Sequence, residues 1–155
     1  MSWLGTVWLV PLYPLVGALF SLLWSPGLIS RTGPRPSGYV NLLMVSIAFG
    51  HSLMALIGLS SNSAAGQAAI YAPPSFHWTW LNTAGLRIGF DGLVSEPALI
   101  AMTVITGLHV LVQIFSIGYL EMDWGWPRFF GALSFFEAGL CGLVLTDSVF
   151  FSYVL

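Results

Sequence analysis

Long apolar stretches separated by short polar segments dominate this chain. A membrane-spanning helix needs roughly 20 mostly apolar residues, and four stretches of the sequence meet this requirement. We predict membrane spans over residues 3–23, 39–59, 97–119 and 129–145. The pattern indicates an all-α polytopic membrane protein with four complete transmembrane helices and the start of a fifth helix over residues 149–155.

The fifth apolar run begins at Val149 and stops at Leu155. A helix that ended there would leave its last carbonyl groups unsatisfied inside the bilayer, which is costly. We therefore expect residues 1–155 to be the N-terminal part of a longer chain. The alternative is a short final helix that is buried in a partner protein.

The first span contains two prolines, Pro11 and Pro14. Proline removes a backbone donor, and neighbouring helices can satisfy the carbonyl that it leaves free in a membrane helix. We therefore expect a kink in this span. No basic residue precedes the apolar run, whereas a cleaved secretory signal has a basic n-region. We interpret the run as a retained span.

The segment between the second and third spans differs from the rest of the chain. Two short runs with roughly alternating apolar residues, Phe76–Leu81 and Leu86–Phe90, flank the turn-forming residues 82–85. Such a pattern is typical of a β-hairpin. We predict an extramembrane hairpin over residues 76–90.

Composition supports the membrane assignment. Hydrophobic residues make up 57% of the chain and charged residues only 6%, while soluble domains carry about a quarter charged residues. The net charge of -2 gives no indication of a nucleic-acid partner. Because the chain has one cysteine, Cys141, cysteine alone can form neither an internal disulfide nor a metal cluster. The lipid bilayer is the first expected partner.

Basic residues in the short loops predict the orientation of the chain. Arg31, Arg35 and Arg128 lie on one side of the predicted spans, and only Arg87 lies on the other. Short loops that are rich in basic residues remain cytoplasmic. We expect the side with three arginines to be cytoplasmic.

Glu137 is the strongest candidate for chemistry. It lies nine positions into the fourth predicted span, within Phe135-Phe136-Glu137-Ala138-Gly139. A charge in the middle of a span costs on the order of 3 kcal/mol, and proton relays are one reason to keep it. The alternative is a carboxyl group that only forms a packing hydrogen bond with another helix. We treat Glu137 as a proton-path candidate.

The other proton-path candidates are less specific. His109 and Gln113 lie four residues apart, so they can share one polar face of the third span. His109 can equally be a packing residue satisfied by a carbonyl group, and His51 is weaker because no charge lies near it in the sequence. Asp147 follows the fourth span and fits a helix N-cap better than a proton carrier.

The chain lacks the usual patterns for a bound cofactor. The sequence contains no glycine-rich phosphate loop, no cysteine pair and no Ser/His/Asp arrangement. We expect no catalytic residues, no metal site and no cofactor-binding site in this chain.

Several segments resemble a known family. They include Phe90-Asp91-Gly92-Leu93, the run from Gly118 to Phe130 and the final residues Phe150–Leu155. Nearly the whole chain is similar to the N-terminal region of the large antiporter-like subunit of respiratory complex I, which is chain 5, or NdhF, of NAD(P)H-quinone oxidoreductase.

This resemblance implies a proton-translocating subunit that has no redox centre of its own. Quinone and iron–sulfur centres would lie in other subunits, and other membrane subunits of an NDH-type complex would be its partners. The family carries its central proton path on a glutamate in the fifth helix and on later lysines, which this sequence does not contain. The family often has histidine where this chain has Gln113, which puts an unaltered proton path in doubt.

The run Gly118–Phe130 together with Phe135-Phe136-Glu137 most resembles the cyanobacterial variants that are associated with inducible CO2 uptake. This likeness implies a thylakoid membrane and a CO2-hydrating accessory protein on the cytoplasmic side. The alternative function is that of a structural or docking subunit with no proton path of its own.

Overall fold

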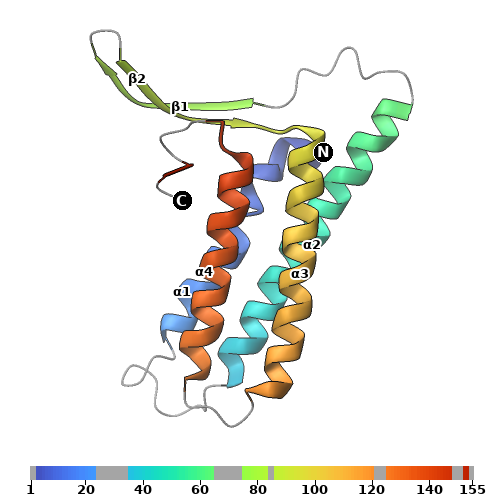
Figure 1. Ribbon diagram of the computed structural model, residues 1–155, viewed down its shortest axis with the longest axis vertical. Coiled ribbons are helices and arrows are strands. Elements are labelled where there is room, and N and C mark those ends of the chain that lie inside the picture. The colour runs from blue at the N-terminus through green and yellow to red at the C-terminus, as the bar shows by residue number, and fades with distance from the viewer. Residues whose placement is uncertain are drawn as a thin grey trace.

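The computed structural model describes residues 3–23, 35–64, 75–83, 86–120, 125–147 and 152–153. Its helices stand side by side as a bundle, and a two-stranded hairpin lies across one end of that bundle (Figure 1). The elements in chain order are η1 (Trp3–Leu9), α1 (Leu12–Leu23), α2 (Arg35–Ala64), β1 (Ser75–Thr83), β2 (Leu86–Leu93), α3 (Glu96–Tyr119) and α4 (Trp126–Leu145). The most extensive helix contacts are those of α2 with α3 and of α1 with α4.

Four helical segments are long and apolar enough to cross a membrane. They are Leu4–Ser21, Pro36–Ser61, Glu96–Tyr119 and Trp126–Leu145. The prediction of an all-α polytopic membrane protein is therefore confirmed. The predicted start of a fifth helix falls almost wholly outside the described residues, which in that region are only Ser152 and Tyr153.

The first span is divided into two helices of different type. The 3-10 helix η1 ends at Leu9, the backbone N–H of Val10 donates to the carbonyl of Val7 at 3.0 Å, and α1 starts at Leu12. Pro11 cannot donate a backbone hydrogen bond, so a regular α-helix cannot run through it without losing one. Pro14 is tolerated because it lies in the first turn of α1. The expected kink takes the form of this change of helix type.

Two helices extend beyond the predicted apolar runs. Helix α2 begins at Arg35 instead of residue 39 and continues to Ala64 instead of residue 59. At its far end, the hydroxyls of Ser60 and Ser61 donate to the carbonyls of Ile57 and Gly58 at 2.9 and 3.0 Å. Helix α4 begins at Trp126, three residues before the predicted start, and proline is favoured in a first helical turn such as the one that holds Pro127.

The hairpin continues directly into α3. Strands β1 and β2 are antiparallel, with Ser75 opposite Leu93 and an irregularity between Thr79 and Leu81. An isolated bridge joins Gly92 to Thr146, the residue that caps the C-terminus of α4. This bridge holds the base of the hairpin against the bundle. The predicted turn falls partly outside the described residues, at positions 84–85.

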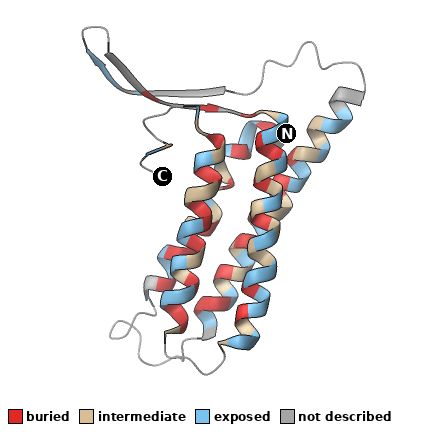
Figure 2. Ribbon diagram, in the orientation of Figure 1, coloured by how far each residue is buried: buried red, intermediate tan, exposed pale blue. Residues whose placement is uncertain are grey.

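The interior of the bundle has two halves of different character. Buried residues follow the facing sides of the helices (Figure 2). The half toward the hairpin contains the main apolar cluster, made of Leu4, Val7, Val10, Ala48, Ala55, Val94, Leu99, Met102, Cys141 and Leu145. The half away from the hairpin contains most of the buried polar side chains, namely Ser21, Ser37, Asn41, Gln113, Ser116 and Ser134. The polar groups are therefore concentrated toward one end of the bundle.

Gly38 allows α2 and α4 to approach closely at that end. An added Cβ atom at Gly38 would lie 2.6 Å from Nε1 and 2.9 Å from Cε2 and Cζ2 of Trp126. The indole is buried at 2% exposure and stacks obliquely on Phe130, with ring centroids 5.0 Å apart. Small residues at such crossings allow membrane helices to pack tightly.

We predict that Gly38→Ala destabilises the bundle by about 1–3 kcal/mol, because the indole of Trp126 must move away from the new methyl group. Gly50→Ala in the same helix is the matched control, since its added Cβ meets no atom within 4 Å. The thermal stability of the detergent-solubilised protein, measured for both variants, checks this. Equal melting temperatures for the two variants would show that this close approach is absent.

Candidate functional site

Glu137 lies inside the bundle near the middle of α4. Its side chain is fully buried, at 0% exposure. Along the helix it is about 17 Å from Trp126 and about 12 Å from Leu145, given a rise of 1.5 Å per residue. Neither carboxylate oxygen has a hydrogen-bond partner among the described residues. The carboxyl group therefore lies where the polar half of the interior meets the apolar cluster.

Gln113 of α3 and Ser134 of α4 form a buried polar pair in the half of the interior away from the hairpin. The amide Nε2 of Gln113 donates to the hydroxyl of Ser134 at 3.0 Å, and both side chains are at 0% exposure. The other amide atom, Oε1, is buried and has no partner among the described residues. Ser134 precedes Glu137 by three residues, so both lie on the same face of α4.

A second polar group lies nearer the end of the bundle. The amide Nδ2 of Asn41 in α2 donates to the hydroxyl of Ser21 in α1, and also to the carbonyl of Ser37 at 2.7 Å. Asn41 Oδ1 and Trp126 Nε1 are buried without a hydrogen-bond partner in the described part of the chain. Buried polar atoms of this kind are normally satisfied by protein groups or by ordered water.

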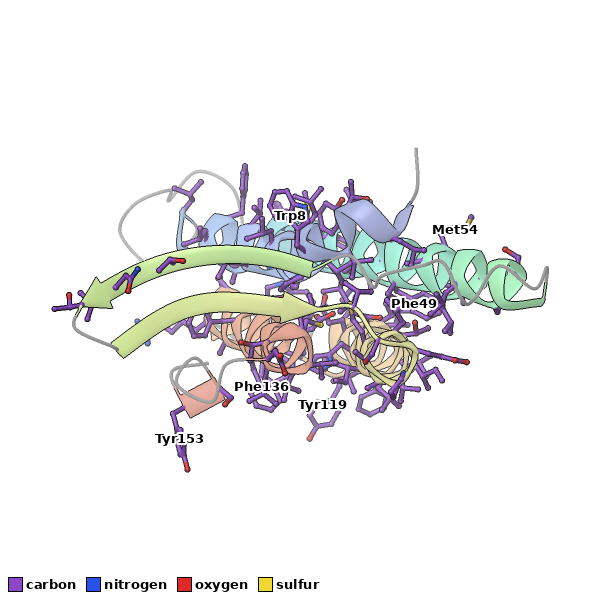
Figure 3. The ribbon with its side chains drawn as sticks, turned by 90° about the horizontal axis from the view of Figure 1, so that it is seen from above. Trp8, Phe49, Met54, Tyr119, Phe136 and Tyr153 are labelled. Atoms are coloured by element: carbon purple, nitrogen blue, oxygen red, sulfur yellow. The ribbon has the colours of Figure 1, made fainter. Side chains whose placement is uncertain are left out.

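His109 occupies a different environment from Gln113. Its Nδ1 lies 3.0 Å from the carbonyl oxygen of Ile105, so Nδ1 carries the proton and donates. The ring is half-buried beside Phe136, with centroids 6.1 Å apart. Figure 3 shows Phe136 and Tyr119 pointing away from the bundle on this side. The structure thus places Gln113 in the interior and His109 at the edge of the bundle.

Asp147 lies outside the bundle. It is exposed and follows Thr146, whose backbone N–H caps α4 by donating to the carbonyl of Gly142 at 3.0 Å. Residues 148–151 fall outside the described part of the chain, so the N-cap interpretation of Asp147 stays a prediction. Asp147 and Glu137 are therefore not brought together.

His51 belongs to the opposite, hairpin-side half of the interior. Its imidazole lies between the hydroxyls of Thr6 and Tyr13, at 3.1 and 3.3 Å. The neighbouring Ser52 contacts Thr106 of α3 through their hydroxyls at 3.2 Å. These five residues form polar contacts beside the apolar cluster.

Several of these polar residues were not predicted to contribute to the site. The sequence pattern does not distinguish Asn41, Ser52 and Ser134, because single polar residues in apolar runs are common in membrane helices. Spacing within a helix could not show which of them face another helix. In the described ranges, no three His, Cys, Asp or Glu side chains are grouped closely enough to hold a metal ion.

The ends of the bundle agree with the expected distribution of arginines. Helices α2 and α4 both begin at the end away from the hairpin (Figure 1), which places Arg35 and the exposed Arg128 there. Arg87 lies in β2, at the opposite end. Arg31 is outside the described residues.

Comparisons with known proteins agree on one family. Residues 80–130 match a family described as the N-terminus of chain 5 of NADH-ubiquinone oxidoreductase, complex I. NAD(P)H-quinone oxidoreductase subunit 5 of the Paulinella chromatophora chromatophore is 37% identical over 148 residues, which are 96% of this chain and 23% of that protein. The chloroplast subunit 5 of Mesostigma viride is 32% identical over 152 residues, covering 95% of this chain and 22% of that protein.

The similarity therefore extends over nearly all of this sequence, while the chain spans about a quarter of the length of these relatives. The family match itself covers the last part of β1, the whole of β2 and α3, and the start of α4. The chain belongs to the chain 5, or NdhF-type, family of NAD(P)H-quinone oxidoreductase subunits.

Proposed function

We propose that this chain helps to form a proton path in the membrane part of an NAD(P)H-quinone oxidoreductase, with Glu137 as its central proton carrier. The observation that carries the proposal is the fully buried carboxyl group, which has no hydrogen-bond partner among the described residues. An ionisable side chain inside a membrane helix is costly and commonly marks an ion or proton route. The family assignment provides the membrane complex in which such a route would operate.

The path we propose begins at the end that bears Arg35 and Arg128. Asn41, Gln113 and Ser134 lie within about 12 Å of that end, measured along their helices. They carry or adjoin the buried polar atoms that lack partners in the described ranges. Water held by these atoms would connect the end of the bundle to Glu137. The excess of arginines there favours the cytoplasmic side.

Two other candidates have subordinate roles in this proposal. His109 borders the interior face on which Gln113 lies, and its Nε2 is the ring nitrogen left for a second contact. Asp147 is exposed at the hairpin end, so it could act only at the far side of the membrane. We propose neither residue as the central carrier.

The wider context of the proposal rests on the relatives. The chain would correspond to the N-terminal part of a longer antiporter-like subunit, since the matching family describes the N-terminus of chain 5. Relatives named as chromatophore and chloroplast subunits support a thylakoid-type membrane and association with the other membrane subunits of such a complex. Redox groups and the quinone would be bound by other subunits, so this chain would contribute no catalytic centre.

We predict that Glu137→Gln lowers the rate of proton translocation by about a hundredfold, since a carboxyl group that transfers a proton typically contributes on this scale. The amide has nearly the same shape but cannot release a proton. Proton uptake by proteoliposomes that contain the assembled complex measures the effect, and quinone reduction in detergent serves as the control. Normal translocation, or loss of assembly alone, would favour the structural and docking function instead.

We also propose that the complex is the variant for inducible CO2 uptake, with a CO2-hydrating protein bound on the cytoplasmic side. The supporting feature is Glu137 together with the sequence around it, which resembles that variant. We predict that the complex purified through a tag on this subunit retains a protein with carbonic anhydrase activity. CO2 hydration in the purified fraction measures this. A pure, active complex with no such activity would contradict the variant assignment.

A further inference from the structure

The apolar half of the interior contains a buried histidine, His51. The imidazole is 6% exposed and lies on α2, between η1 and α1. Nε2 lies 3.1 Å from the hydroxyl oxygen of Thr6, and Nδ1 lies 3.3 Å from the hydroxyl oxygen of Tyr13. Each ring nitrogen of a largely buried histidine therefore faces a hydroxyl group from a different helix.

This arrangement allows both neutral forms of the ring. A neutral imidazole has one nitrogen that donates and one that accepts, and a hydroxyl group can do either. When the hydroxyl groups of Thr6 and Tyr13 rotate, either tautomer of His51 is satisfied. A carbonyl oxygen in either place would fix the tautomer, as the carbonyl of Ile105 does for Nδ1 of His109.

His51 lies at nearly the same level of the bundle as Glu137. The neighbouring Ser52 contacts Thr106 of α3, and Thr106 is about 15 Å along its helix from Glu96 at the hairpin end. Glu137 is about 12 Å along α4 from Leu145 at the same end. The hydroxyl groups of Ser52 and Thr106 therefore lie in the layer that contains both ionisable side chains.

The hydrogen-bonded group of Tyr13, His51 and Thr6 reaches the surface of the bundle at Thr6. Thr6 is exposed, and it lies in η1, which precedes α1 on the hairpin side of the bundle. Tyr13 is partly buried and packs against the apolar cluster, whose member Cys141 follows Glu137 by one helical turn. The three side chains thus extend from the layer of Glu137 toward the hairpin end.

We propose that Tyr13, His51 and Thr6 form the hairpin-side segment of the proton path. In this step the hydroxyl of Tyr13 gives its proton to Nδ1 of His51, while Nε2 gives its proton to the hydroxyl oxygen of Thr6. Tyr13 then regains a proton that the carboxyl group of Glu137 releases, and Thr6 passes its extra proton to water. The ring stays neutral overall, and its return to the first tautomer resets the segment. This inference rests on the proposed function of Glu137.

A purely structural alternative makes a different prediction. The same hydrogen bonds could hold η1 and α1 against α2 where Pro11 interrupts the helix. Loss of such contacts would lower stability or assembly, and it would affect electron transfer together with proton translocation. A proton-transfer segment affects translocation alone.

The test uses Thr6→Val, which keeps the shape of the side chain and removes the hydroxyl group, and Tyr13→Phe, which keeps the ring. Thr6→Ser is the matched control because it retains the hydroxyl. Each variant is made in the complete subunit and assembled into the complex in proteoliposomes. Proton translocation, its solvent isotope effect and quinone reduction are measured together, with Glu137→Gln in parallel.

We expect Thr6→Val and Tyr13→Phe to slow proton translocation by about tenfold or more, with quinone reduction unchanged in detergent and Thr6→Ser near normal. Normal translocation in both variants beside a loss in Glu137→Gln would overturn this segment and leave the role of Glu137 intact. Loss in the Thr6 and Tyr13 variants beside normal Glu137→Gln would support the segment and overturn the proposed carrier. Parallel loss of assembly, electron transfer and translocation would show that the group only holds the helices.

Discussion

The absence of water from the hydrocarbon layer governs this structure, because every polar group placed there must find a partner within the protein. The backbone meets the requirement by forming helices, and the break at Pro11 falls where η1 gives way to α1. Side chains meet it by pairing across helices, as Asn41 does with Ser21 and Gln113 with Ser134. Glu137 is the buried carboxyl group for which the described residues provide no such partner.

The two halves of the interior satisfy this requirement differently. Apolar side chains seal the hairpin half, whereas amides and hydroxyls fill the half that begins with Arg35 and Arg128. In our proposal, the carboxyl group of Glu137 at this boundary exchanges protons with water through the polar half, and the apolar half prevents a free leak. In the path that we propose, protons cross the apolar half through the hydroxyl–imidazole–hydroxyl group at His51.

The sequence predicted the spans well because their length and apolar character follow directly from the thickness of a bilayer. The sequence underestimated the length of α2. Ser60 and Ser61 lie in its last turns and donate hydrogen bonds to carbonyls one turn earlier, and hydropathy does not detect such bonds. Glu137 was found because a lone acid in an apolar run is conspicuous. The partners Asn41 and Ser134 were missed because their importance depends on which helices face each other, and this is decided by contacts such as that of Gly38 with Trp126.

The central claim is that Glu137 changes its protonation as the complex works. Infrared difference spectroscopy of the assembled complex, recorded between the resting and the turning-over states, tests this directly. Our account predicts a carboxyl C=O band that changes with turnover, shifts in D2O and disappears in Glu137→Gln. A carboxyl spectrum that is the same at rest and during turnover, in a complex that translocates protons, would contradict it.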